Sequence, residues 1–169
     1  GVDISEASIR LSKEKMKKNK NNFKIIKPRP KSDDDFFKTK FDLIISAQTL
    51  YYLSNEDLKN RLSSLKRMLK PNGFVFFTMM SKQCASWTRF SNKKINSAGL
   101  TLVNLNSHKK LKKRQKQPTY RNYINFVCNE KDLVKKFKLF KKIVVGSYDT
   151  AIESLRLSGH HFTFFGKKY

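Results

Sequence analysis

The clearest strand in the sequence is the stretch Phe41-Asp42-Leu43-Ile44-Ile45-Ser46. Its apolar run, residues 43–45, does not alternate with polar residues, which is typical of a parallel strand covered on both faces. A helix is expected next, because Ser54 and Asp57 form a capping-box-like pair at its start. An apolar stripe at steps of four, three and four residues then indicates a helix with one buried side. Its members are Leu58, Leu62, Leu65 and Leu69.

Downstream of this helix the sequence predicts a turn and another strand. Pro71-Asn72-Gly73 ends the helix, and residues 74–80 are expected to form a buried strand. Residues 81–122 show no clear periodicity and are too long for an ordinary connection. This stretch is therefore the expected place for substrate-facing structure or a mobile flap.

The end of the chain predicts one helix and two strands. Residues 129–140 are expected to form a helix that turns Leu133, Phe137 and Phe140 inward. Strands are expected at residues 143–148 and 160–166, with 149–159 as their connection, and the lack of a full-length crossover helix favours antiparallel pairing. The alternation of strands and helices predicts a three-layer α/β sandwich with a mainly parallel sheet, in one domain that spans the 169 residues.

The chain opens with an acidic residue, Asp3, after the stub of a strand and before a helix. In α/β proteins a carboxylate at this position binds the two hydroxyls of a ribose. A helix-start carboxylate that only complements the helix dipole is the alternative. Ser5 is expected to cap the helix, which runs to about Lys18. A short strand is expected at residues 23–26, followed by a loop over 27–40 that contains two prolines.

The composition fits a folded protein with a strong positive charge. Apolar residues make up 38% of the chain, and no stretch reaches the roughly 20 apolar residues of a membrane span. Neither Cys84 and Cys128 nor the three histidines have metal-ligand spacing, so we expect a cytoplasmic protein without a metal site. The net charge of +24 has two open explanations, a polyanionic partner such as RNA or a general bias toward lysine.

Three segments resemble class I S-adenosylmethionine-dependent methyltransferases. Gly1-Val2-Asp3-Ile4-Ser5 is similar to the end of the family's second strand, and residues 41–46 with Leu50-Tyr51-Tyr52-Leu53 resemble its fourth strand and following turn. Residues 65–74, with their Pro-Asn-Gly turn, are similar to its helix and fifth strand. The ending, residues 160–168, is similar to its last strand, and only residues 81–122 lie outside the likeness.

The resemblance implies a Rossmann-like sheet with an antiparallel last strand and S-adenosylmethionine as the methyl donor. Asp3 matches the ribose-binding acid and Ile4 the apolar residue that packs on adenine. The segment near the donor's methionine part corresponds to Ser46, Ala47 and Gln48, and Tyr51 matches a position close to cofactor or acceptor.

The sequence departs from the family pattern in two places. The acidic residue that contacts the adenine amino group is displaced by a few positions, which leaves Asp33 as the candidate. The family's first strand and its glycine-rich loop have no counterpart before Gly1, so the resemblance predicts an N-terminally truncated domain.

The expected reaction is methyl transfer to an oxygen or nitrogen of a small molecule, with residues 81–128 as the substrate-facing insertion. Trp87, Tyr120 and Tyr123 are the candidate residues for the acceptor pocket, with ordinary core packing as the alternative. The lysine-rich run 109–116 is the place where RNA would bind, and a solvated flap is the alternative. RNA methylation and a non-catalytic basic binding module are the competing functions. No membrane partner is expected, and the sequence does not predict the oligomeric state.

Overall fold

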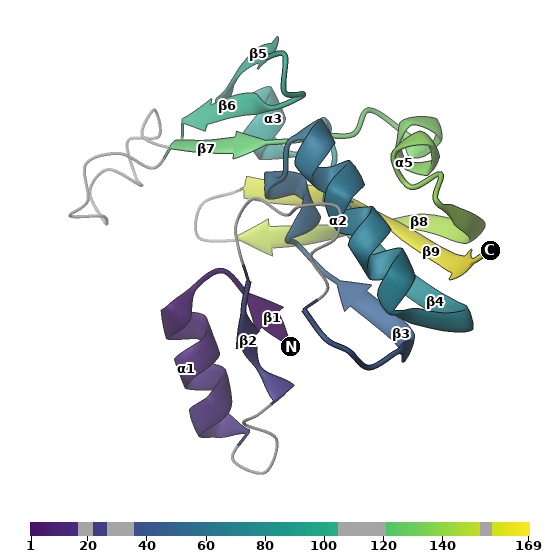
Figure 1. Ribbon diagram of the computed structural model, residues 1–169. Helices are drawn as coiled ribbons and strands as arrows, with labels where there is room; N and C mark the ends of the chain where they lie inside the picture. The colour runs from purple at the N-terminus through teal and green to yellow at the C-terminus, as the bar shows by residue number, and fades with distance from the viewer. Residues whose placement is uncertain (17–21, 27–35, 105–120, 153–156) are drawn as a thin grey trace.

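The structure of the chain is a computed structural model that describes residues 1–16, 22–26, 36–104, 121–152 and 157–169 (Figure 1). The elements in chain order are β1 (Val2–Asp3), α1 (Glu6–Lys15), β2 (Lys24–Ile25), β3 (Phe41–Ser46), a 3-10 turn (Leu50–Tyr52), α2 (Asn55–Met68), β4 (Leu69–Met80), α3 (Ala85–Thr88), β5 (Ser91–Ile95), β6 (Thr101–Asn104), β7 (Arg121–Ile124), α5 (Glu130–Lys136), β8 (Phe140–Ile152) and β9 (Leu157–Lys168).

The strands form three sheets, of which the four-stranded sheet is the centre of the molecule. Its strand order is β3-β4-β9-β8. β3 and β4 pair in parallel, whereas β9 pairs antiparallel with both of its neighbours, so β3, β4 and β8 point the same way. The antiparallel pairing of the last two strands is therefore confirmed. β1 and β2 form a separate parallel pair, and β5, β6 and β7 form an antiparallel sheet.

The sequence pattern of α2 explains how this helix packs. The Ser54 hydroxyl accepts a hydrogen bond from the Asp57 amide at 3.0 Å and donates to the Asp57 carboxylate at 2.7 Å, so the predicted pair does cap the helix. All four members of the predicted apolar stripe are buried. The helix lies against one face of the four-stranded sheet (Figure 1), and α5 covers the same face through Phe137, whose ring lies 5.1 Å from both Phe77 and Phe164.

The prediction that β3 is covered on both faces is wrong for the described residues. Ile44 packs on the core, but Leu43 and Ile45 are 46% and 63% exposed. Successive side chains of a strand point to opposite faces. The helices that cover the four-stranded sheet therefore protect one of its faces, and the three-layer expectation is not met over β3.

The turn at residues 71–73 also differs from the prediction. The helix ends at Met68, and β4 already pairs with Phe41 through Leu69. Between Phe41 and Leu43 the register shifts, so residues 71–73 form a bulge within β4, where Asn72 has φ of 63°. The end of the chain shows a second difference. Residues 149–159 were expected only to connect, yet β8 and β9 extend as one hairpin to the pair Ile152 and Leu157.

Most of the other predicted elements are present with shifted ends. Ser5 caps α1 by accepting a hydrogen bond from the Ser8 amide, but the helix ends at Lys15 rather than near Lys18. The predicted helix over 129–140 is shorter, because β8 begins at Phe140. The inward residues of that prediction, Leu133, Phe137 and Phe140, are all buried.

The stretch after β4, for which the sequence predicted no elements, contains α3 and leads into the three-stranded sheet. This sheet is attached to the carboxyl end of β4 by hydrogen bonds. The Val127 amide donates to the Met80 carbonyl at 3.0 Å, and Ser81 and Val127 form a parallel bridge. Buried Asn125 donates its backbone amide to the Tyr51 carbonyl at 2.7 Å. Its side chain accepts from the Lys136 ammonium at 2.8 Å, and burial lowers the pKa of that lysine.

One face of the four-stranded sheet is covered and the other is exposed. Shortening a side chain should therefore lower the free energy of unfolding by different amounts on the two faces. Phe77→Ala should lower the free energy of unfolding by about 3–5 kcal/mol, because the buried ring leaves a cavity among Phe137 and Phe140. Ile45→Ala should lower it by less than about 1 kcal/mol, because that side chain keeps most of its contact with water. Urea unfolding followed by circular dichroism measures both. Equal losses would mean that the outer side of β3 is buried.

Candidate functional site

The turn after β3 is held in an unusual conformation by its own side chains. Gln48 has φ of 56°, in the left-handed region that residues other than glycine seldom adopt. Its amide donates to the hydroxyl of buried Thr78 on β4 at 2.7 Å. The Ser46 and Thr49 hydroxyls are hydrogen-bonded at 2.5 Å. These bonds fix the backbone of residues 46–49 at the carboxyl end of the parallel pair, where α/β proteins bind ligands.

Two antiparallel strands bring aromatic groups to the same edge. The Gln48 side-chain amide donates to the Tyr148 hydroxyl of β8 at 3.2 Å. The Tyr148 ring stacks on His161 of β9, with 5.0 Å between centroids and 10° between planes. Met80, His161 and Tyr148 are cross-strand partners, so the pairing register itself places them together. The edge thus combines hydroxyl and amide groups with aromatic rings.

His161 is a buried polar group without a hydrogen-bond partner. Its side chain is 3% exposed, and neither ring nitrogen makes a hydrogen bond within the described residues. Burial is the main cause that lowers the pKa of His161. The imidazole is therefore neutral near pH 7.

Tyr51 lies next to this histidine and is also buried. Its ring centroid is 6.0 Å from that of His161 and 4.6 Å from that of Tyr52. Burial, followed by the neighbouring Tyr52, raises the pKa of Tyr51, so its hydroxyl stays protonated at neutral pH. Tyr52 is half exposed and is the more accessible ring of the pair.

Asp3 lies on the separate β1–β2 sheet. One oxygen, Oδ1, accepts a hydrogen bond from the Ser5 amide at 2.8 Å, which is the helix-start role. The other oxygen, Oδ2, makes no hydrogen bond with the described residues. Ile4 is mostly exposed beside it. Asp3 itself is partly buried, whereas Asp33 lies outside the described residues.

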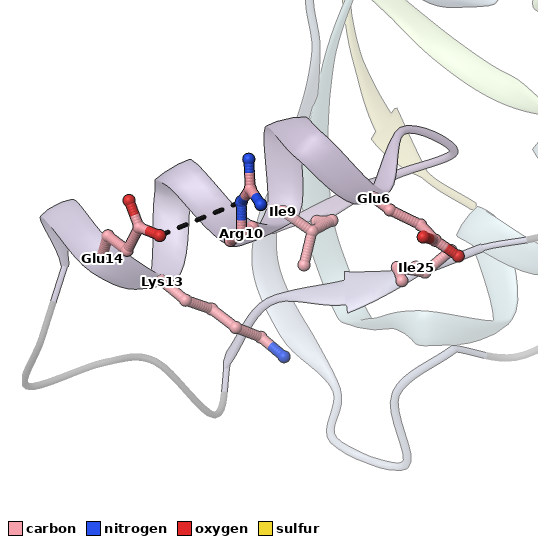
Figure 2. Close-up of a pocket in the computed structure, with 6 residues that line it drawn as sticks. All are labelled: Glu6, Ile9, Arg10, Lys13, Glu14 and Ile25. Atoms are coloured by element: carbon pink, nitrogen blue, oxygen red, sulfur yellow. Dashed lines mark ion pairs between the residues drawn. The ribbon is translucent and has the colours of Figure 1, made fainter.

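An open groove of about 410 Å³ lies on the α1 side of this unit (Figure 2). Ile9 and Ile25 line it together with four charged residues, Glu6, Arg10, Lys13 and Glu14. Its ion pair, Arg10–Glu14, is long at 4.0 Å and its side chains are mostly exposed. This groove contains neither Asp3 nor the hydrogen-bonded turn after β3, so the predicted site residues lie outside it.

Comparison with known proteins relates this geometry to a family. Residues 1–75 match the model of a methyltransferase domain. The fold is similar to a SAM-dependent methyltransferase from Methanosarcina mazei, at 15% identity and a TM-score of 0.71, over 99% of this chain and 80% of that one. The chain therefore has the fold of S-adenosylmethionine-dependent methyltransferases, and its first 75 residues resemble a methyltransferase domain in sequence.

Two further solved structures have a similar fold. The CcbJ methyltransferase from Streptomyces caelestis is 11% identical, with a TM-score of 0.64 over 100% of this chain and 78% of that one. The N-methyltransferase NodS from Bradyrhizobium japonicum, solved with S-adenosyl-L-homocysteine, is 10% identical, with a TM-score of 0.54 over 99% and 64%. No curated protein matches the chain in sequence.

The residues predicted to contact the acceptor lie in different environments. Trp87 is half-buried, with its ring edge-on to Phe126 at 5.2 Å and the Lys82 ammonium 4.4 Å from its centre. Tyr123 is 52% exposed on β7. Tyr120 and the lysine run 109–116 lie outside the described residues.

The structure joins only part of the predicted site. Ser46, Ala47 and Gln48 form one turn with buried Tyr51 directly after it, whereas Asp3 and Ile4 lie on another sheet. Sequence reasoning missed Thr78, Tyr148 and His161. They lie on strands far apart in the chain, and only the pairing register shows that they meet Gln48 and one another. Within the described residues no three His, Cys, Asp or Glu side chains could hold a metal ion.

The lowered pKa of His161 predicts a pH-dependent stability. Because the folded protein binds this proton less well, the contribution of His161 is complete above its unfolded pKa of about 6.5. It is lost as the pH falls from that value to the lower pKa of the folded protein. His161→Phe keeps the ring stack and removes the titration. Urea unfolding between about pH 7.5 and pH 5 should therefore show a smaller loss of stability in the variant. Identical losses would exclude a perturbed imidazole.

Proposed function

We propose that the protein is a methyltransferase that transfers the methyl group of S-adenosylmethionine to an oxygen or nitrogen atom of a small molecule. The main supporting observation is the edge formed by Gln48, Tyr148 and His161. A few neutral hydrogen-bonding groups set among aromatic rings are typical of pockets for small molecules. The acceptor is then oriented by hydroxyl and amide groups and excluded from water by rings.

The residues at the carboxyl ends of β1 and β3 fit the donor. The Oδ2 atom of Asp3 is suited to accept hydrogen bonds from the ribose, and Ile4 is suited to pack against adenine. Ser46, Ala47 and Gln48 would lie near the methionine part, and the buried Tyr51 would support that turn from below. Asp33 is proposed for the adenine amino group. The bound donor supplies an activated methyl group, so the chain needs only to position the two reactants.

The acceptor would lie between this edge and the small sheet. Asn125 and Val127 are hydrogen-bonded to Tyr51 and Met80, so the sheet that precedes them adjoins the proposed donor side. We propose Trp87, Tyr120 and Tyr123 as acceptor contacts. The neutral His161 is the nearby group that could accept a proton, whereas the raised pKa keeps Tyr51 protonated.

RNA is the second proposed acceptor. Tyr123 is half exposed on β7, and the same sheet carries the exposed Lys93 and Lys94 on β5. An exposed ring beside lysines suits a stacked base and its phosphate. None of the helices in the described part of the chain has the length and hydrophobicity to cross a membrane. The cytoplasmic location stays a prediction.

The ribose role of Asp3 is tested by Asp3→Asn, which keeps an oxygen to cap Ser5 but removes the charge. Losing charge-assisted hydrogen bonds should weaken binding of S-adenosylhomocysteine by roughly 1.5–3 kcal/mol, or ten- to a hundredfold. Asp42→Asn is the matched control, because Asp42 binds exposed Lys70 at 2.9 Å on another strand. Calorimetric titration measures both, and equal affinities in wild type and Asp3→Asn would remove Asp3 from the site.

The acceptor class is tested with methyl-labelled S-adenosylmethionine. The protein is incubated separately with a low-molecular-mass cell extract and with total RNA. Label should enter the small-molecule fraction and depend on Asp3. Label in nuclease-sensitive RNA, reduced by Tyr123→Ala, would favour the second proposal. If neither donor product nor label binds, the chain is a non-catalytic form of the fold.

A further inference from the structure

A fully buried asparagine joins the three-stranded sheet to the turn that carries Tyr51. Asn125 directly follows β7, and its backbone amide donates to the Tyr51 carbonyl at 2.7 Å. Its side-chain nitrogen, Nδ2, donates to the Leu53 carbonyl at 3.1 Å and to Asn55 Oδ1 at 3.0 Å. A single residue at the end of β7 therefore holds the 3-10 turn on both sides of Tyr52.

A lysine of α5 completes the hydrogen bonds of this side chain. The Lys136 ammonium donates to Asn125 Oδ1 at 2.8 Å and to Asn55 Oδ1 at 3.4 Å. Because an ammonium group can only donate, it fixes the oxygen of Asn125 toward α5 and the nitrogen toward Leu53. Both polar atoms of the Asn125 side chain are thus hydrogen-bonded. We call Asn55, Asn125 and Lys136 the polar junction, which links the end of β7 to α2 and α5.

The turn between β5 and β6 meets the polar junction as well. The Asn55 amide donates to the Ala98 carbonyl at 2.9 Å. Gly99 has φ of 79°, and a Cβ atom there would lie only 2.1 Å from Asn55 Nδ2, so the Asn55 side chain lies directly against this glycine. Thr101 pairs with Ile124, which puts this turn and the end of β7 at the same end of the sheet. The three-stranded sheet therefore meets α2 through that one end.

The polar junction is close in the chain to the proposed acceptor contacts. Tyr123 comes two residues before Asn125. Phe126, the residue after it, has its ring 5.2 Å from that of Trp87. A shift of Asn125 would therefore move both acceptor contacts relative to the turn of Tyr51. Losing one member of a buried network leaves its partners unsatisfied, so the network favours a single arrangement.

We propose that Asn125 is a positioning residue, which Lys136 locks in place, and that the polar junction holds the acceptor contacts at a fixed distance from the turn of Tyr51. The part of this inference that concerns the acceptor rests on the proposed function, whereas the junction consists of contacts within the chain. Neither residue needs to touch a substrate. Loosening the junction should therefore weaken use of the acceptor and leave binding of the donor product unchanged.

Amide hydrogen exchange, measured by NMR on the 169-residue chain, tests the polar junction without a ligand. Lys136→Met removes the ammonium and should speed exchange of the Asn125 amide about tenfold, because the junction opens more often. The amide of buried Leu62, in the middle of α2, should exchange at an unchanged rate. Lys136→Arg keeps a charged donor and should restore slow exchange. Lys131→Met, at an exposed lysine of the same helix, is the matched control and should have no effect.

The positioning role is tested with methyl-labelled S-adenosylmethionine and the fraction that takes up the label, either the low-molecular-mass extract or RNA. Lys136→Met should raise the amount of that fraction needed for half-maximal labelling at least about fivefold. The affinity for S-adenosylhomocysteine, measured by calorimetry, should change less than about twofold. Lys136→Arg should restore labelling. Asn55→Ala, which removes the second acceptor of the ammonium, should give the same pattern in a weaker form.

Two kinds of result would overturn the proposal. Unchanged exchange of the Asn125 amide in Lys136→Met, or an equal increase at Leu62, would show that the polar junction does not hold the sheet. Faster exchange with unchanged half-maximal labelling, or with an equal loss of S-adenosylhomocysteine affinity, would show that it does not position the acceptor. If the wild type transfers no label, the proposed function fails, and the exchange rates alone decide whether Asn125 positions the sheet.

Discussion

Three phenylalanine rings hold the described structure together. Phe77 of β4, Phe164 of β9 and Phe137 at the end of α5 are fully buried, and the Phe137 ring lies 5.1 Å from each of the other two. Their packing joins two strands to the helix that precedes β8. It thereby fixes which face of each strand is inner, and alternation along the strand then decides the direction of every neighbouring side chain.

The candidate site follows from that constraint. With Phe77 inward, the next residue, Thr78, receives the Gln48 amide and holds the turn after β3. Phe164 points inward, so His161, three residues earlier, points to the other face of the sheet. The register then pairs His161 with Tyr148 and Met80. A one-residue slip of β9 would send His161 to the opposite face and break the stack on Tyr148. The register of β4, β9 and β8 therefore determines both the packing of the core and the geometry of the site.

Local patterns in the sequence predicted the elements that depend on near neighbours. The Ser54–Asp57 cap, the leucine stripe of α2 and the inward residues of α5 needed only spacing within one helix. The exposure of one side of β3 could not be predicted from the sequence, because an apolar strand shows the same pattern whether or not a second layer packs on it. Tyr148 and His161 lie within predicted strands, but their contact was missed because it depends on the pairing register, which the sequence pattern does not give.

Neutral and charged side chains lie at opposite ends of β8 and β9. On β9 Lys167 lies six positions after His161, and on β8 Lys141 lies seven positions before Tyr148. The two ends of these strands are therefore about 20 Å apart. The groups hydrogen-bonded around Gln48 are neutral, whereas lysines occupy the opposite end. A distance of this size exceeds the screening length at physiological salt. The basic character of these strands therefore bears only weakly on an acceptor beside Gln48.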